Sequence, residues 1–249
     1  FIRGMSSVSS NFSTYDNVII YNSDTLGLTI GGFSFSNEHN TTVTNSRSGN
    51  IEGSTNQEDG ISVSGGGNFT ITNNNFSSNT RYGISLGTSD NNIITNNTIT
   101  SEGASTYGIY NNQADNNLYS NNTITTSGAS SRGVYSSTSD NTNFTNTIIT
   151  ATGDSSQGME IYSGGAPQII GGTVNSTAER LNISDSGDVV VKDVILIGTT
   201  LNDTYLTVNT NAIFTNVSYS TEYVAADSSV LTRNWYLDVN VTNVNGVVQ

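Results

Sequence analysis

The stretch that decides the fold is Tyr82–Gly158, in which one short pattern of residues recurs with a spacing of 25. Its copies open with YGIS (82–85), YGIY (107–110), RGVY (132–135) and QGME (157–160). Each copy puts a glycine in one column, and an aspartate follows in three of them: Gly83, Gly108, Gly133 and Gly158; Asp90, Asp115 and Asp140. A fixed period of this size indicates stacked copies of one supersecondary unit that cannot bury its apolar face alone.

Two apolar phrases within each copy have the alternation of short β-strands. Ile84 and Leu86 flank Ser85, which predicts a strand with one buried face. A second phrase places an asparagine between two apolar positions, as in Ile94, Asn97 and Ile99. A short polar side chain at such a bend can bond to its neighbours in the coils above and below. We therefore predict a ladder of stacked amides made by Asn74, Asn97 and Asn122.

The phrases extend beyond the best copies and predict an all-β, parallel β-helix over residues 1–222. We expect about eight or nine coils, and at roughly 4.8 Å per coil the stack would be on the order of 40 Å long. A polar segment containing Arg47, Glu58 and Asp59 reads as a loop insertion. A helical solenoid is disfavoured because the units are rich in Asn, Thr, Ser and Gly, and a sandwich of hairpins would not need identical connections every 25 residues.

Residues 223–249 have a different pattern and form a predicted C-terminal extension. Leu231–Val241 alternates apolar and polar residues, and Asn243–Gly246 resembles a hairpin turn. This strand either caps the last coil or pairs with a following module or another chain.

Composition excludes several classes of protein. The 249 residues carry 7 Lys plus Arg against 20 Asp plus Glu, and a net charge of −13 disfavours nucleic acids and anionic membranes as partners. There is no Cys and one His, which excludes disulfides and thiolate zinc sites. No apolar run approaches the roughly 20 residues needed to span a bilayer. The absence of an initiator Met suggests a piece of a longer precursor.

Asn-x-Ser/Thr sequons favour an extracellular location, since they are the acceptors of N-linked glycans. The candidate sites are Asn11, Asn40, Asn68, Asn75, Asn96, Asn121, Asn143, Asn175, Asn182, Asn202, Asn216 and Asn240. Asn96 and Asn121 lie one period apart and each precedes a ladder asparagine, so their side chains should point outward.

The segments GISL (83–86), SDNNII (89–94) and NNTI (96–99) resemble the parallel β-helix repeats of the pectin-lyase-like superfamily, especially NosD-like archaeal cell-surface glycoproteins. The resemblance covers roughly residues 15 to 220 and implies a right-handed, single-chain parallel β-helix. It does not choose an activity, because that superfamily includes lyases, hydrolases, epimerases, adhesins and inert surface modules. The C-terminal extension resembles the start of an Ig-like module in archaeal surface proteins.

Three groups of residues are candidates for a functional site. Asp90, Asp115 and Asp140 would stack closely enough to hold calcium, although each could instead cap its own turn by accepting backbone N–H bonds. A predicted contact face consists of Tyr82, Tyr107, Tyr110, Arg132 and Tyr135, and would suit a neighbouring subunit, a sugar, or neither.

Catalysis has weak support in the sequence. The candidate catalytic residues are Asp140, Glu160 and Arg132, which come from different phrases of the repeat. The stack is also regular where an active site would normally interrupt it. No cofactor is indicated apart from the possible calcium. The sequence therefore favours a structural cell-surface or secreted protein, either a glycosylated spacer or a subunit of a surface layer or filament. A carbohydrate-binding or carbohydrate-processing domain is the alternative.

Overall fold

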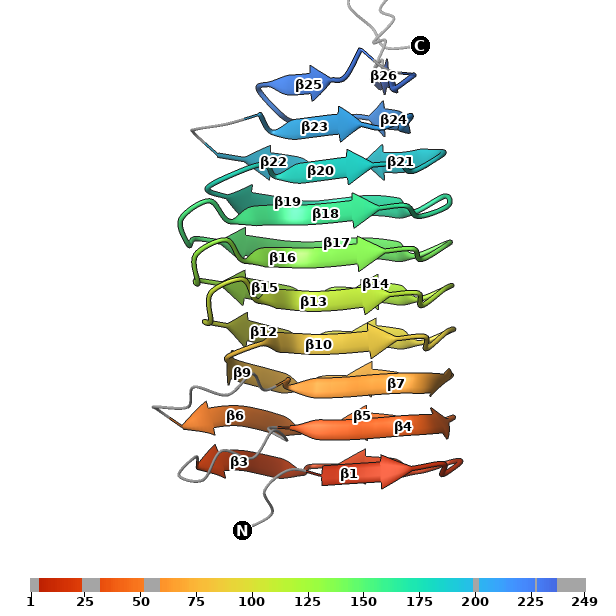
Figure 1. Cartoon of the computed structure of the whole chain (residues 1–249), viewed down its shortest axis with the longest axis vertical. Helices are drawn as coiled ribbons and strands as arrows, with labels where there is room; N and C mark the ends of the chain where they lie inside the picture. Colours follow the sequence, from red (N-terminus) through yellow and green to blue (C-terminus); the bar gives the residue numbers. More distant parts are fainter. Residues whose placement is uncertain (1–4, 24–31, 52–58, 199–201, 227, 237–249) are drawn as a thin grey trace, which may run out of the picture.

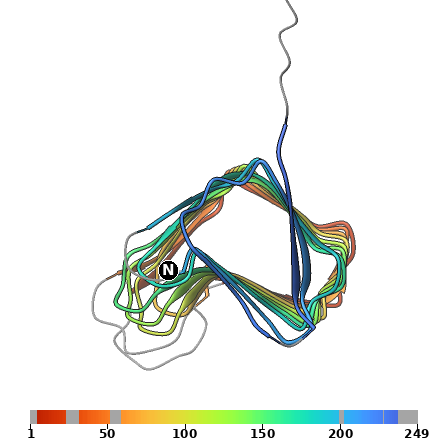
Figure 2. The same cartoon turned by 90° about the horizontal axis from the view of Figure 1, so that it is seen from above.

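A computed structural model describes residues 5–23, 32–51, 59–198, 202–226 and 228–236. Within these residues the chain is a parallel β-helix, in which each coil lies on the one before it and equivalent strands pair in parallel (Figure 1). Seen along the stack, the coils superimpose on a triangular outline with three sides (Figure 2). The predicted all-β, parallel β-helix is confirmed.

Sheet A forms one side and has ten strands in the described residues. Its strands are β1 (Met5–Val8), β4 (Phe33–His39), β7 (Ile61–Gly67), β10 (Tyr82–Gly87), β13 (Tyr107–Asn112), β16 (Arg132–Ser137), β18 (Gln157–Tyr162), β20 (Leu181–Ser184), β23 (Thr204–Thr207) and β25 (Glu222–Val224). Sheet A therefore contains slightly more strands than the eight or nine coils that we predicted from the repeated phrases.

Sheet B forms the other two sides, and its strands β17 (Asn143–Ala151) and β19 (Gln168–Ser176) run through both. Its first side also contains β2 (Thr14–Asp16), β5 (Thr42–Thr44), β8 (Thr70–Thr72), β11 (Ile93–Thr95), β14 (Leu118–Ser120), β21 (Val189–Lys192), β24 (Asn211–Thr215) and β26 (Val230–Asn234). Its second side also contains β3 (Ile19–Ser23), β6 (Arg47–Ile51), β9 (Asn75–Asn79), β12 (Thr98–Ser101), β15 (Thr123–Thr126) and β22 (Ile195–Ile197).

The 25-residue period sets the pairing register in the middle of the stack. Tyr82 pairs with Tyr107, and Tyr107 with Arg132. Apolar side chains of the three sides, Ile84 and Ile94 among them, meet in one continuous core. The glycine column is needed because the interior is tight beside it: a Cβ on Gly108 would lie 2.2 Å from Ile124 Cγ2.

The predicted asparagine ladder lies inside the corner that joins the two sides of sheet B. Asn97 Nδ2 donates to Asn122 Oδ1 at 3.1 Å, and Asn74 Nδ2 donates to Asn97 Oδ1 at 3.1 Å. Asn97 Oδ1 also accepts the backbone N–H of Asn74, and Asn97 Nδ2 also donates to the backbone carbonyl of Ile71. All three amides are buried, so they satisfy backbone groups that the turn removes from the sheets.

A second ladder, absent from our sequence prediction, lies at the corner between sheet A and sheet B. Asn92 Nδ2 donates to Asn117 Oδ1 at 2.9 Å, and this oxygen also accepts the Asn92 backbone N–H at 2.8 Å. Asn111 Oδ1 accepts bonds from Asn117 Nδ2 and from the hydroxyl of the buried Tyr119. Asn92 and Asn117 are 25 residues apart, so the repeat period is the feature of the sequence that could have predicted this second ladder.

Two expectations about the ends of the stack need comment. The expected loop at Arg47 is wrong, because Arg47–Ile51 is strand β6 and pairs with β3 and β9; its residues lack the apolar alternation that marks the other strands. At the other end β26 pairs with β24, so residues 230–234 extend the stack. Glu58, residues 237–241 and the turn at Asn243–Gly246 lie outside the described residues.

We expect Asn97→Ala to lower the free energy of unfolding by about 2 to 4 kcal/mol, because it leaves the Asn74 N–H and the Ile71 carbonyl buried without their amide partner. Thr123→Ala, at an exposed position of β15, should change it by less than about 0.5 kcal/mol. Urea unfolding followed by circular dichroism measures both values. Equal effects of the two substitutions would contradict a stabilising ladder.

Candidate functional site

The outward surface of sheet A carries a cluster of four tyrosines, Tyr82, Tyr107, Tyr110 and Tyr135, which we call the tyrosine strip. Tyr82 stacks on Tyr107 with ring centroids 5.1 Å apart and on Tyr110 with centroids 4.7 Å apart. Tyr135 stacks on both Tyr107 and Tyr110. The rings come from β10, β13 and β16, where parallel pairing brings equivalent side chains together. Burial raises the pKa of Tyr107 and Tyr110, so both phenols are neutral near pH 7.

Arg132 lies at one end of the tyrosine strip, among the rings. Its guanidinium carbon is 5.3 Å from the ring centroid of Tyr107 and 5.5 Å from that of Tyr135. Its Nη1 donates to the Tyr107 hydroxyl at 3.2 Å, its Nε donates to Gln157 Oε1 at 2.9 Å, and it forms an ion pair with Glu160. These contacts fix the orientation of the guanidinium and neutralise its charge.

Arg81 and Asp59 lie at the other end. The Arg81 guanidinium carbon is 4.5 Å from the ring centroid of Tyr82, and its Nε is 3.7 Å from Asp59 Oδ1. The same oxygen accepts the backbone N–H of Tyr82. Burial raises the pKa of Asp59 to about 6, although the nearby Arg81 charge and the Tyr82 N–H act in the opposite direction. The tyrosine strip is thus bounded at both ends by an arginine–carboxylate pair.

The three weak catalytic candidates do not converge. Arg132 and Glu160 form an ion pair on the outer surface of sheet A, whereas Asp140 lies in the turn between β16 and β17, where its Oδ1 accepts the backbone N–H of Gly165. Gly165 lies five residues beyond Glu160 along the coil. Asp140 and Glu160 therefore have separate partners and do not share a reacting site.

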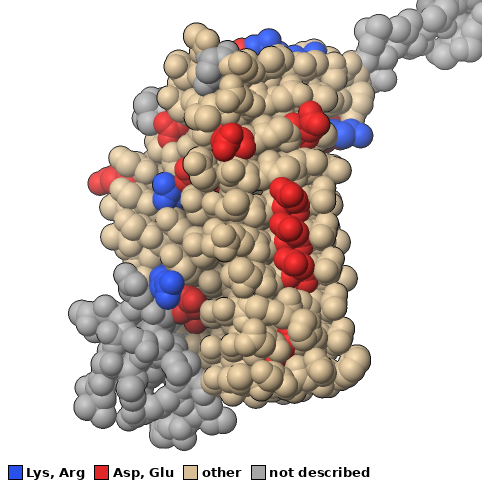
Figure 3. All heavy atoms as spheres, turned by 45° about the vertical axis from the view of Figure 1, so that its right-hand side comes forward, with Lys and Arg blue, Asp and Glu red and all other residues tan. Residues whose placement is uncertain are grey.

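The predicted acidic column is present at a corner of the β-helix, and Figure 3 shows a vertical row of acidic side chains on this face. Asp115 donates its backbone N–H to Asp90 Oδ1 at 2.8 Å, and Asp140 donates its own to Asp115 Oδ1 at 2.8 Å. The expectation that each carboxylate caps its own turn is corrected, since each bonds to the next coil. Among the described residues no group of three or more His, Asp or Glu is arranged to hold a metal ion.

The sequon asparagines differ in exposure. Those with exposed side chains are Asn11, Asn40, Asn68, Asn96, Asn121, Asn175 and Asn216. Those that are partly buried are Asn75, Asn143, Asn182 and Asn202. Asn240 lies outside the described residues. Asn96 and Asn121 have φ values of 56° and 53°, so both occupy the left-handed conformation that asparagine tolerates well.

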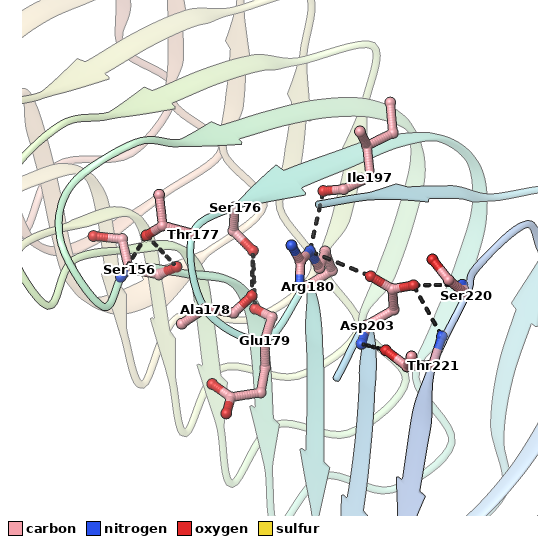
Figure 4. Close-up of polar contacts among 10 residues, drawn as sticks. All are labelled: Ser156, Ser176, Thr177, Ala178, Glu179, Arg180, Ile197, Asp203, Ser220 and Thr221. Atoms are coloured by element: carbon pink, nitrogen blue, oxygen red, sulfur yellow. Dashed lines mark hydrogen bonds and ion pairs between the residues drawn. The ribbon is translucent and has the colours of Figure 1, made fainter. Parts of the chain in front are cut away.

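A buried ion pair that the sequence did not suggest lies near the C-terminal end of the stack (Figure 4). Arg180 occupies the position of the glycine column one coil after Gly158, and its Nε is 3.4 Å from Asp203 Oδ1. The side chains are 0% and 2% exposed. Arg180 Nε also donates to the Ile197 carbonyl, and Asp203 Oδ2 accepts the N–H groups of Ser220 and Thr221. The pair is a structural element of the interior.

The fold places the chain among parallel β-helix proteins. The family described as the right handed beta helix region matches residues 49–195, more than half of the sequence, so the chain belongs to this family and its coils are right-handed. No curated protein sequence matches it significantly. In the part of the chain that the structure describes, no helix is long and apolar enough to cross a membrane.

Solved structures with the same fold differ in function. A double mutant of the periplasmic alginate epimerase AlgG has a TM-score of 0.67 at 12% identity, covering 93% of this chain and 71% of that one. The A-module of the Azotobacter vinelandii mannuronan C-5 epimerase AlgE4 has a TM-score of 0.55 at 11% identity, covering 92% and 87%. The Streptococcus pneumoniae surface protein and adhesin PfbA has a TM-score of 0.51 at 12% identity, covering 91% and 68%. At such identities the likeness shows the fold alone.

The pKa of Asp59 predicts a pH-dependent contribution to stability. Folded Asp59 has a pKa of about 6 against 3.8 for the free group, so the folded state binds its proton more tightly, and this contribution is lost as the pH rises from about 4 to about 6. The loss is roughly 3 kcal/mol at most. Asp59→Asn should remove this part of the pH profile, measured by urea unfolding at pH 4 and pH 7. Parallel profiles for the two proteins would contradict the raised pKa.

Breaking the buried ion pair should be costly. Arg180→Met leaves the Asp203 carboxylate buried without its cation, and we expect a loss of about 3 to 5 kcal/mol in the free energy of unfolding. Adding Asp203→Asn should recover part of that loss, because the amide carries no charge. A double-mutant cycle by chemical denaturation measures the coupling, and strictly additive effects would show that the pair contributes nothing.

Proposed function

We propose that this chain is a rigid extracellular structural module that contacts copies of itself, or other surface-protein modules, through the tyrosine strip. The observation that carries the proposal is the pairing of charges around the rings. Arg132 with Glu160 and Arg81 with Asp59 leave stacked aromatic faces as the distinctive outward feature. Tyrosine and arginine, together with tryptophan, are enriched at the energetic centres of protein interfaces.

The remaining geometry supports a structural role over a catalytic one. The acidic column is engaged with backbone N–H groups, and the amide ladders make the corners rigid. The exposed sequons are distributed along the stack, so glycans at Asn96 and Asn121 would project side by side from one edge. An extracellular location agrees with these sequons and with the periplasmic and surface proteins that share the fold.

The second candidate is a carbohydrate-binding or carbohydrate-processing domain. It is favoured by the flat, stacked tyrosine faces, because aromatic rings suit stacking against a sugar ring. The likeness to two epimerases that act on acidic polysaccharides makes this candidate worth testing. Binding of oligouronates, with and without calcium, and analysis for new unsaturated or epimerised products would test it.

Tyr107→Ser combined with Tyr110→Ser should weaken self-association at least tenfold, because it removes the two rings at the centre of the tyrosine strip. Tyr162→Ser is the matched control, since Tyr162 is an exposed tyrosine of sheet A outside the strip. Sedimentation equilibrium over a concentration series, up to millimolar protein, measures the dissociation constants. A wild-type protein that stays monomeric while binding an oligosaccharide through the same tyrosines would favour the second candidate.

A further inference from the structure

The chain contains pairs of identical sequons that the fold places in different surroundings. Asn-Phe-Thr occurs at Asn68 and again at Asn143, and Asn-Phe-Ser occurs at Asn11 and again at Asn75. Asn68 and Asn11 have exposed side chains, whereas those of Asn143 and Asn75 are partly buried. The third residue of the sequon is partly buried in all four cases. Within each pair, therefore, the tripeptide is the same and the surroundings of the asparagine differ.

The exposed member of the first pair lies at a corner of the β-helix. Asn68 lies between β7 and β8, where sheet A meets the first side of sheet B, and its φ of 59° places it in the left-handed conformation. Its side chain is on the outside of the bend, because it is exposed while that of the next residue, Phe69, is 1% exposed. A sugar attached to Asn68 Nδ2 would therefore extend into solvent.

The partly buried members are the first residues of strands, with paired strands on both sides. Asn143 begins β17 and lies between Leu118 of β14 and Gln168 of β19 in the parallel register. Asn75 begins β9 and lies in the same way between β6 and β12. The side-chain oxygen of each asparagine is buried. Since neighbouring strands are only about 4.8 Å apart, a sugar on either amide would have to displace the side chains packed against it.

The outer surface of sheet A has no exposed sequon among the described residues. Its strands contain one sequon asparagine, Asn182, whose side chain is partly buried and whose Oδ1 is buried. The register places Asn182 between Glu160 and Tyr205. The exposed sequons lie instead at the two corners that flank the first side of sheet B, with the exception of Asn175 in β19. The surface that carries the tyrosine strip is thus separate from the exposed sequons.

We propose that the folded chain accepts N-linked glycans at its exposed sequons alone, so that the sugars leave the tyrosine strip bare and the partly buried sequons stay unmodified. The donor is an oligosaccharide joined to a lipid through a diphosphate. The asparagine Nδ2 forms a bond to the anomeric carbon of the sugar, the lipid diphosphate leaves with the electron pair of the broken bond, and the amide loses one proton to a base of the transferase. The inference rests on the extracellular location in the proposed function, because N-linked glycans occur on surface segments of secreted proteins.

Transfer of glycans to the folded chain tests this selection. The chain, purified without glycans and shown to be folded by circular dichroism, is incubated with an oligosaccharyltransferase and a lipid-linked oligosaccharide. Mass spectrometry of its peptides then gives the occupancy of each sequon. We expect at least tenfold more transfer to Asn68 than to Asn143, and to Asn11 than to Asn75. Equal transfer within either pair would overturn the proposal, as would the absence of transfer to Asn68 by an enzyme that modifies a free Asn-Phe-Thr peptide.

A new sequon at the same corner supplies the second arm. Asn91 lies one coil beyond Asn68, is exposed and has a φ of 59°. Ile93→Thr completes an Asn-Asn-Thr sequon there, the tripeptide that also begins at Asn96. Threonine suits this position, because Ile93 is 46% exposed and pairs with Thr70. We expect transfer to Asn91 of the variant within twofold of the transfer to Asn96, and no transfer to Asn91 would overturn the proposal.

The inference and the proposed function fail in different measurements. Self-association of the unmodified chain is measured without sugars, so a tyrosine strip whose substitution has no effect on association refutes the proposed function. Transfer to the partly buried sequons at the same level as to the exposed ones refutes this inference and leaves the association result as it stands.

Discussion

The interaction on which this structure depends is the hydrogen bond that a buried corner residue makes with the coil above or below it. A chain that turns inside a stack removes backbone N–H and C=O groups from the sheets, and such groups are costly when buried without partners. At the corner within sheet B, the amides of Asn74, Asn97 and Asn122 supply those partners. Each amide has a donor and an acceptor, so one residue type can serve the coils on both sides of it. The triangular outline of the molecule follows from these corners.

Stacking in register also brings identical side chains together. This contact is favourable for some residue types and unfavourable for others. Tyrosines gain from it, because offset stacking of rings is favourable. Aspartates lose from it, because like charges a few ångströms apart repel one another. The structure offsets that cost by giving each carboxylate a backbone N–H from the next coil, as Asp115 gives Asp90. The acidic column is thereby a structural feature as well as an exposed charge.

The period predicted the fold and most of the candidate site because both consist of residues that repeat. The pairing of Tyr82 with Tyr107 and Arg132 follows from counting 25 residues. The buried pair of Arg180 and Asp203 could not be found in this way, since that coil is shorter and Arg180 lies 22 residues after Gly158. Strand β6 was missed because its sequence has no alternating apolar pattern. It is held in the sheet by backbone pairing with β3 and β9. Asp59 was assigned to a loop, and its contact with Arg81 depends on tertiary structure.

The distinction between repeated and unrepeated residues also indicates where function lies. Corner and core positions are determined by the stack: Gly108 has no room for a Cβ, and Asn97 has four hydrogen bonds to make. Outward strand positions carry no such constraint, so the residues found there reflect what the surface contacts. Arg132 follows Tyr82 and Tyr107 in one such column on sheet A. Its bonds to Tyr107 and Gln157 join neighbouring coils, and the stacked rings beside it present the aromatic surface that we propose as a contact.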